Sequence, residues 1–327
     1  MPEPCAYFRG EYMNPKDAKI GIMTHAFHYG TGTFGGINAT WDAENERFCL
    51  FRMLDHYRRQ LVACKMLHIH LPYSEHDMAA ITAEAVRRTG FRQNVYCRPV
   101  AYKSSESLGV RLHDLDADWL VIATVLPPFA SAGGLRCCVS SWTRTCDSQM
   151  PTLGKITGTY VNGALTKTEA QMDGYDDGIM LTPEGHVSEG AVTNTFFVLN
   201  GRLTTPPPSD GILLGMTRDT VMQLARNELG IETMERSIVR SELYRAEEAF
   251  FTGTYSGVVP IVEIDHRRVG SGDPGPLTLK LQSLYRQLAL GRTERYANWY
   301  TYVRPGGSEP TAGLSDDTAE AAVARPA

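Results

Sequence analysis

Hydrophobic and polar positions repeat with two periods along this chain, and each period predicts one kind of element. Apolar residues recur at helical spacing over 53–67, from 74 to about 88, over 160–171, over 216–229 and over roughly 276–290. Short apolar or alternating runs at 6–8, 48–52, 95–102, 118–126, 178–182 and 195–200 are typical of strands. A strand is also expected in LRCCVSSW, and a strand–turn–strand unit in AFFTGTYSGVVPIVEID. The pattern predicts a mixed α and β chain.

Two local signals refine these elements. Ser74, with Asp77 three residues later, predicts a capping box at the start of the second helix. Pro99 lies inside the alternating run 95–102, and proline donates no ladder hydrogen bond. We therefore expect that run to be an edge strand or to carry a bulge.

The hydrophobic pattern breaks at residues 127–134, PPFASAGG, where prolines, glycines and small residues replace it. We expect a linker there, between a small N-terminal domain at 1–126 and a larger second domain at 135–304. The last stretch, 305–327, is small, polar and acidic, and is expected to be a disordered tail.

Charge and composition exclude several classes of protein. The 327 residues carry a net charge of -5, so the chain lacks the basic footprint of nucleic-acid or membrane-surface binding. It has no run of membrane-spanning length and no signal-peptide core. The seven cysteines show no CxxC spacing, which predicts free thiols and a cytoplasmic location. His68 and His70 form an isolated HxH without further ligands nearby, so no metal site is expected.

Lys155 is the first candidate for chemistry, because Met150–Tyr160 contains no other ionisable side chain except Tyr160. A lysine in apolar surroundings has a lowered pKa, so its amine can act as a nucleophile and later as a base. We expect Lys155 to form a Schiff base. Tyr160 could contact the phenolic oxygen of a pyridoxal ring, although a core aromatic is the alternative.

Glu189 is the second candidate and is expected in a Ser-Glu-Gly turn. A carboxylate beside a pyridine nitrogen keeps that nitrogen protonated, which makes the ring an electron sink. A solvated turn glutamate is the alternative interpretation.

An anion site is the third candidate. Gly215-Met216-Thr217 opens a helix, where N–H groups and the helix dipole favour a phosphate. Thr254 at a strand end and Arg52 could add a hydroxyl and a charge-assisted bond. A helix cap, a turn and a surface arginine are the respective alternatives for Thr217, Thr254 and Arg52.

These segments occur in an order that resembles a known family. The chain is similar to the branched-chain amino acid aminotransferases, in the D-alanine aminotransferase-like (fold type IV) class of pyridoxal-phosphate enzymes, over about residues 3–303. The motifs that carry the resemblance are HYGTGTFGGI, FRMLDHYRR, YCRP, SSWTR, MPTLGKITGTYVN, GYDDGIML, SEGAVTNTFFV, TPPPSDGILLGMTRD, FFTGTYSGVVPIVEID and NWYTYV.

The resemblance implies an α+β or α/β two-domain fold, with a small N-terminal α/β domain and a larger C-terminal pseudo-barrel domain that binds the cofactor. It implies pyridoxal 5'-phosphate as cofactor and a homodimer as the active unit. Lys155 matches the Schiff-base lysine. The residues that match cofactor contacts are Arg52, Tyr160, Glu189, Asn194, Met216, Thr217 and Thr254. Those that match substrate contacts are Tyr29, Phe34, Tyr96, Arg98 and Val110, the last lent by the partner subunit, with Tyr255 and Ser256 where the substrate carboxylate meets backbone.

The implied reaction is a ping-pong exchange of an amino group between an L-amino acid, branched-chain or related, and a 2-oxo acid such as 2-oxoglutarate. Three departures from the family pattern favour a specialised substrate range. The usual charges of FEGIR are lost at Gly35 and Asn38, the linker is short, and Tyr255-Ser256 replaces two alanines.

Three alternatives stay open at this point. One is a lyase such as aminodeoxychorismate lyase, another a D-amino acid or R-amine transaminase, and the third a non-catalytic cofactor-binding protein.

Overall fold

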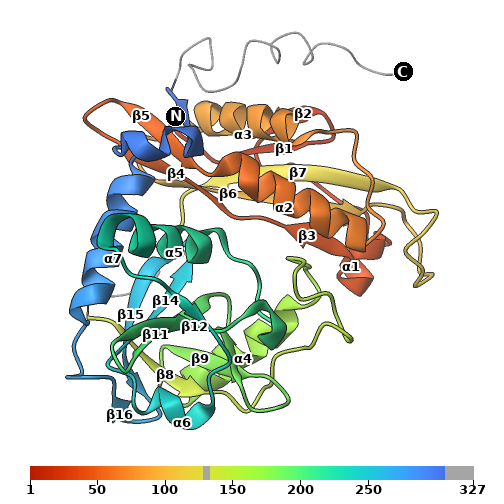
Figure 1. Ribbon diagram of the computed structural model, residues 1–327. Helices are drawn as coiled ribbons and strands as arrows, with labels where there is room; N and C mark the ends of the chain where they lie inside the picture. Colours follow the sequence, from red (N-terminus) through yellow and green to blue (C-terminus); the bar gives the residue numbers. More distant parts are fainter. Residues whose placement is uncertain (128–132, 306–327) are drawn as a thin grey trace. The chain divides into compact units, whose positions relative to one another are not determined.

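A computed structural model describes residues 1–127 and 133–305 of the chain. It divides into two compact units, one containing Met1–Pro127 together with the chain from Gln287 onward, the other ending at Arg286. Each unit has its own sheet (Figure 1). Most of the predicted linker at 127–134 and of the predicted tail at 305–327 lies outside the described residues, so both stay predictions.

The first unit has an eight-stranded sheet in the order β17-β5-β4-β6-β7-β1-β2, with β3 paired to β6. Helix α3 packs on β1 and β7, and α2 packs on α3 and β3. The strands are β1 (Cys5–Phe8), β2 (Glu11–Met13), β3 (Gly32–Phe34), β4 (Ile37–Asp42), β5 (Arg47–Phe51), β6 (Val95–Lys103), β7 (Ala117–Thr124) and β17 (Tyr300–Val303). The helices are α1 (His25–Tyr29), α2 (Met53–Met66), α3 (Glu75–Thr89) and the 3₁₀ helix η2 (Glu294–Trp299).

The last strand of the chain completes this first sheet. β17 pairs antiparallel with β5, with Tyr300 opposite Phe51 and Val303 opposite Phe48. The second unit therefore ends earlier than the predicted residue 304, because an edge position beside β5 satisfies the backbone of residues 300–303.

Pro99 lies inside the sheet and the register on both sides of it is continuous, so the prediction of an edge strand or a bulge is wrong. β6 pairs with β7 on one side, and with β3 and β4 on the other. β3 ends at Phe34 and β4 begins at Ile37, at the place where Pro99 has no N–H to donate; the carbonyl of Pro99 still accepts a hydrogen bond from the N–H of Gly35 (2.9 Å).

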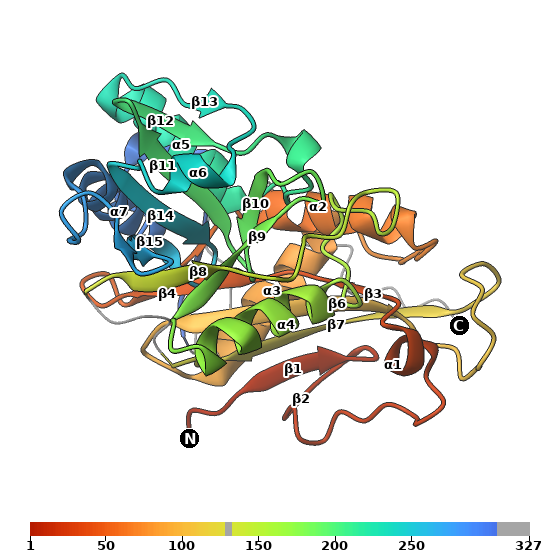
Figure 2. The same ribbon diagram turned by 90° about the horizontal axis from the view of Figure 1, so that it is seen from below.

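The second unit contains a closed, barrel-like arrangement of strands (Figure 2). The order β10-β9-β8-β15-β14-β11 closes on itself because β10 also pairs with β11. The strands are β8 (Leu135–Val139), β9 (Asp177–Leu181), β10 (Val187–Gly190), β11 (Asn194–Leu199), β12 (Arg202–Thr205), β13 (Met234–Glu235), β14 (Glu248–Gly253), β15 (Gly257–Ile264) and β16 (Arg267–Arg268). The helices are α4 (Tyr160–Met172), η1 (Pro208–Asp210), α5 (Met216–Leu229), α6 (Arg240–Leu243) and α7 (Pro276–Ala289). The predicted fold class, with a pseudo-barrel in its second half, is confirmed.

Apolar packing fixes the barrel. Phe197, Phe251, Ile179 and Ile261 belong to one buried cluster, and none of them is more than 2% exposed. Helix α4 packs along β9, and α5 packs against β14. These packings position the two helix starts that matter for the site, Tyr160 on α4 and Thr217 on α5.

The helix signals also agree with the structure. Ser74 Oγ accepts the N–H of Asp77 at 3.2 Å, and Asp77 Oδ2 accepts the N–H of Ser74 at 2.8 Å, which confirms the capping box. Among the described residues no helix has the length and hydrophobicity to cross a membrane.

Candidate active site

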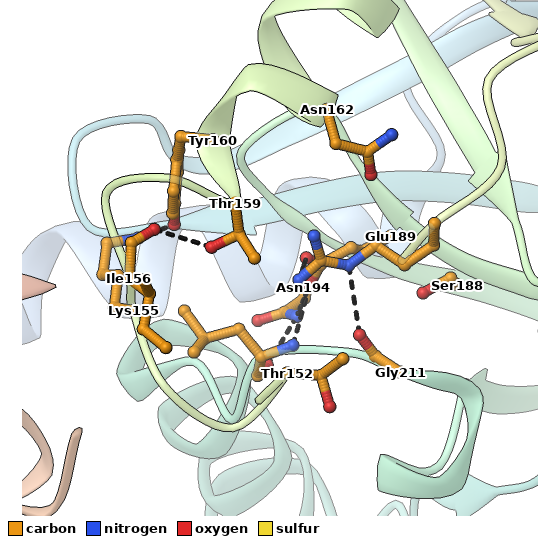
Figure 3. Close-up of polar contacts among 12 residues, drawn as sticks. Thr152, Lys155, Ile156, Thr159, Tyr160, Asn162, Ser188, Glu189, Asn194 and Gly211 are labelled. Atoms are coloured by element: carbon orange, nitrogen blue, oxygen red, sulfur yellow. Dashed lines mark hydrogen bonds and ion pairs between the residues drawn. The ribbon is translucent and has the colours of Figure 1, made fainter. Parts of the chain in front are cut away.

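Lys155 and Tyr160 contact each other directly (Figure 3). Tyr160 is the first residue of α4, and Lys155 lies in the loop before it. Lys155 Nζ donates a hydrogen bond to Tyr160 Oη and lies 4.8 Å from the centroid of the tyrosine ring. Thr159 Oγ1 donates to the carbonyl of Ile156 at 2.6 Å, which holds the loop between them. The hydrogen bond thus keeps the amine and the phenol side by side.

Glu189 lies in strand β10 and not in a turn, so that part of the sequence interpretation is wrong. The residue is only 7% exposed, because pairing of Glu189 with Asn194 closes the barrel at this point. Glu189 Oε2 accepts hydrogen bonds from Asn194 Nδ2 (3.1 Å) and from the N–H of Leu213 (2.9 Å). Because it is buried and hydrogen-bonded, the carboxylate of Glu189 is held in one position and is not a solvated surface group.

Arg144 is the partner of Glu189 that sequence reasoning missed. Its Nη2 lies 3.0 Å from Glu189 Oε1, and both side chains are nearly buried, at 10% and 9% exposure. Its Nε donates to the carbonyl of Gly211 at 3.1 Å. The residue stands in the motif SSWTR, but only the need of a buried carboxylate for a cation could have singled it out.

Opposing effects act on the pKa of Glu189. Burial raises the pKa of the Glu189 carboxyl, while Arg144, the N–H of Leu213 and Lys155 lower it. The net direction is upward from the ordinary value. A positively charged group beside Glu189, such as a protonated pyridine nitrogen, would supply a further opposing charge.

The predicted phosphate ligands of the second unit lie at element ends. Met216 and Thr217 open α5 after Gly215, and Thr217 is 3% exposed. Thr254 directly follows β14, the strand against which α5 packs. Tyr255 and Ser256 complete the turn, where Ser256 Oγ contacts the carbonyl of Gly253 (3.4 Å).

Arg52 belongs to the first unit, where it precedes α2 with a φ of 52°. It is no free surface arginine: its Nε donates to Asp55 at 2.8 Å, and its guanidinium stacks over Trp299 at 4.6 Å. Its role at the phosphate stays a prediction.

Three of the predicted substrate residues form one cluster in the first unit. The guanidinium of Arg98 lies 4.7 Å from the ring centroid of Phe34 and 5.3 Å from that of Tyr96. Arg98 Nη2 also donates to Tyr96 Oη at 3.1 Å. Its Nε is buried without a hydrogen-bond partner in the described parts of the chain. The Nε–H of Arg98 is therefore a donor without an acceptor among the described residues, and its guanidinium lies beside two aromatic rings.

Tyr29 and the loop that carries Val110 meet at another place in this unit. Tyr29 Oη donates to the carbonyl of Leu108 at 2.5 Å, which joins α1 to the loop that carries Val110. Val110 is 73% exposed. Its role at a partner's substrate site stays a prediction.

Close packing against β6 explains why residues 35 and 36 of the FGGIN segment are glycines. A Cβ on Gly36 would lie 2.2 Å from Tyr96 Oη, and one on Gly35 would lie 2.8 Å from Pro99 Cγ. The loss of the family's glutamate at position 35 therefore accompanies close packing against β6.

The second unit offers the groups that pyridoxal 5'-phosphate requires. An amine and a phenol are hydrogen-bonded to each other, a buried carboxylate is held by a cation, and a helix N-terminus follows a glycine. Gly215 leaves no room for a side chain, since a Cβ there would lie 2.1 Å from Asn194 Oδ1. The residues fit the cofactor.

Substitution of Gly215 by alanine is expected to weaken cofactor binding. The added methyl group must displace Asn194, which would break its hydrogen bonds to Glu189 (3.1 Å) and to the carbonyl of Leu213 (2.8 Å). Losing a bond to a buried charge predicts a dissociation constant about tenfold higher or more, measured by titrating the cofactor-free chain with pyridoxal phosphate. Gly133→Ala is the control, because a Cβ there meets no described residue within 4 Å. An unchanged constant would show that Asn194 does not support the site.

Comparisons with known proteins identify the family of the chain. The amino-transferase class IV family model matches residues 39–264. A probable branched-chain-amino-acid aminotransferase of Aquifex aeolicus is 43% identical over 302 residues, covering 91% of this chain and 96% of the relative. The branched-chain-amino-acid aminotransferase of Pseudomonas aeruginosa is 36% identical, covering 91% of this chain and 97% of its own.

Solved structures of aminotransferases resemble the chain as well. The branched-chain aminotransferase of Thermoproteus uzoniensis with norvaline has a TM-score of 0.87 and 39% identity, covering 91% of this chain and 98% of its own. The T.th. branched-chain amino acid aminotransferase complexed with N-(5'-phosphopyridoxyl)-L-glutamate has a TM-score of 0.86 and 34% identity, with coverages of 91% and 97%. The chain therefore belongs to the class IV aminotransferases of fold type IV, transaminases that depend on pyridoxal 5'-phosphate.

Proposed function

We propose that this aminotransferase exchanges the amino group of a branched-chain L-amino acid with that of 2-oxoglutarate or a similar 2-oxo acid. The cluster of Arg98, Tyr96 and Phe34 carries the proposal. Its rings offer apolar contact to an aliphatic side chain, while the buried Nε of Arg98 offers a donor to an acidic one. The relatives named branched-chain aminotransferases, and neighbours solved with norvaline and with a phosphopyridoxyl glutamate, support both halves of the pair.

Pyridoxal phosphate, when bound, supplies the electron sink that makes the α-proton of an amino acid acidic. Lys155 would hold the cofactor through Nζ and, once released by the donor amine, carry the α-proton on the same atom. Tyr160 Oη accepts a hydrogen bond from that amine and so orients it. Glu189 would hold a proton at the ring nitrogen, and Arg144 favours its ionised form. Thr217, Thr254 and Arg52 are proposed to bind the phosphate.

A donor–acceptor panel on the purified enzyme tests the proposal. Leucine, isoleucine and valine should turn over faster with 2-oxoglutarate than other L-donors, D-donors or R-amines. Arg98→Met should raise the KM for 2-oxoglutarate about tenfold or more, with a smaller change for leucine, because the charged contact is lost only for the acidic substrate. Arg47→Met is the matched control, since Arg47 stacks over Tyr302 at 3.7 Å in the same unit.

The same panel separates the alternatives. Faster turnover of another donor would favour the specialised range that Gly35, Asn38 and Tyr255-Ser256 suggested. Pyruvate release from aminodeoxychorismate without an amino acceptor would favour the lyase. A preference for D-donors or R-amines would reverse the stereochemical assignment.

We also propose that the enzyme works as a homodimer. The first unit exposes an apolar surface on two segments, 20–29 and 106–110, which an isolated bridge between Thr24 and Glu106 joins. The large side chains on it are Ile20 (46% exposed), Ile22 (82%), Met23 (38%), Phe27 (68%), Leu108 (54%) and Val110 (73%). Water-exposed apolar patches of this kind mark protein interfaces.

The dimer is tested by sedimentation of two variants. Ile22→Glu should shift the enzyme toward the monomer, because a charge at the centre of an apolar interface costs roughly 2 kcal/mol or more. Leu279→Glu, at an exposed position of α7 (47% exposed), should leave the dimer intact. A monomeric wild-type enzyme with full activity would refute the proposal.

A further inference from the structure

A cavity of about 270 Å³ lies in the second unit, and Arg144, the cation that pairs with Glu189, forms part of its wall. Four segments line it: 144–147, 152–153, 182–184 and 208–211. The volume is close to the lower end of the ~300–1,000 Å³ typical of small-molecule sites. None of the residues predicted to contact cofactor or substrate lines it.

The cavity has an excess of negative charge. Asp147, Glu184 and Asp210 line it, against a single cation, Arg144. That cation is already engaged, because Arg144 bonds Glu189 (3.0 Å) and the carbonyl of Gly211 (3.1 Å). The wall would therefore attract a positively charged ligand.

Asp210 adds an unfilled acceptor to this wall. The residue is 5% exposed, and its Oδ1 accepts a hydrogen bond from Ser237 Oγ at 3.0 Å. His186 Nδ1 lies 3.8 Å from the same Oδ1, which is too far for a hydrogen bond. Oδ2 is buried without a hydrogen-bond partner among the described residues. A buried carboxylate oxygen left this way costs free energy, and a ligand donor that reached it would stabilise it.

The rest of the lining decides between kinds of cation. No group of three or more His, Cys, Asp or Glu side chains is placed to hold a metal ion within residues 1–127 and 133–305. Leu153, Pro183 and Pro208 give the cavity apolar surface as well. A ligand with an N⁺–H donor and a small hydrocarbon body meets both requirements.

We propose that this cavity binds a small organic ammonium ion, at a site separate from the cofactor and independent of which amino donor the enzyme uses. Asp210 provides the principal carboxylate, and Glu184 adds charge at the rim. Arg144, the cation that pairs with Glu189, forms part of the wall together with Gly211. The bound ion would therefore be separated from Glu189 by the side chain of Arg144.

Cys146 provides the readout. It lines the cavity and is partly exposed, while the six other cysteines of the chain are buried. The probe is trimethylammonium, a tertiary amine that cannot condense with the cofactor aldehyde. In the holoenzyme it should slow modification of Cys146 by a thiol reagent about fivefold at saturation, with a roughly millimolar midpoint, since so few atoms supply little binding energy. Cys146→Ser identifies the reacting thiol.

Asp210→Asn should raise the midpoint of protection roughly tenfold, as expected for loss of a charged hydrogen bond. Glu184→Gln changes only an exposed rim group and should raise it about threefold, which keeps the test informative where the Asp210→Asn variant fails to fold. Glu232→Gln removes an exposed charge elsewhere in the unit (72% exposed) and should change nothing. Absence of protection, equal protection by neutral tert-butanol or by potassium chloride at the same ionic strength, or unchanged midpoints in both cavity variants would overturn the proposal.

Discussion

Replacement of Lys155 by alanine is expected to abolish transamination and to remove the visible absorbance of the lysine-bound cofactor. The residue combines two tasks that no neighbour can take over. Its amine is the nucleophile that holds the cofactor, and it is also the base that carries the substrate's α-proton. Tyr160, which is hydrogen-bonded to Lys155 Nζ, is a phenol and can serve neither as this nucleophile nor as this base. The loss of rate should be about 10⁴-fold or more.

The measurement is made on matched proteins. Lys280→Ala, at an exposed position of α7, should keep both the absorbance and the rate. Borohydride reduction of the wild type followed by peptide mapping should find the cofactor attached to Lys155. A variant at position 155 that keeps the lysine-bound spectrum would refute the central assignment of this site.

The parts of the site that sequence could predict are local. Lys155 and Tyr160 are separated by one loop at a helix start, so their contact depends on short-range geometry. The start of α5 at Met216 and Thr217, and its end at Gly230, likewise follow from local propensity and capping. Such contacts can be predicted from sequence because only a few backbone conformations can connect residues so close along the chain.

The parts that sequence could not predict depend on pairing across the fold. Glu189 looked like a turn residue because glycines surround it, but closure of the barrel through Asn194 makes it part of a strand. Pro99 lies in an interior strand, where the continuous pairing of β6 with β7 and the hydrogen bond from Gly35 hold it in spite of its missing N–H. Non-local pairing overrides local propensity in each case.

Arg144 is the clearest example, since nothing in its neighbours indicates that its guanidinium reaches Glu189. The effect of removing its charge follows from electrostatics. Arg144→Met should lower the free energy of unfolding of the cofactor-free chain by about 3–5 kcal/mol near neutral pH, because it leaves a buried carboxylate without its cation. Activity of the holoenzyme should fall roughly 10- to 100-fold, since loss of Arg144 favours the neutral form of Glu189, which holds the cofactor's ring proton less well.

The sign of the pH dependence follows from the pKa of Glu189. Burial raises this pKa above its usual 4.5 in the folded chain, and Arg144 opposes the rise. Without Arg144 the folded-state pKa rises further, so the folded chain binds more protons than the unfolded chain above pH 4.5. The free energy of unfolding of the variant should therefore fall as the pH increases from 4.5 through the raised pKa, and level off above it.

A double-mutant cycle identifies the cause. Arg144→Met combined with Glu189→Gln should recover most of the lost stability at neutral pH and lose the pH dependence, because no buried charge is left unpaired. Arg226→Met removes one member of an exposed pair (62% and 72% exposed) and should cost at most about 1 kcal/mol at every pH. Denaturant titrations of the cofactor-free proteins at several pH values supply the free energies. If Arg144→Met is equally destabilising at pH 4.5 and at neutral pH, and the double variant is no more stable, then Arg144 supports the barrel by packing and not by its charge.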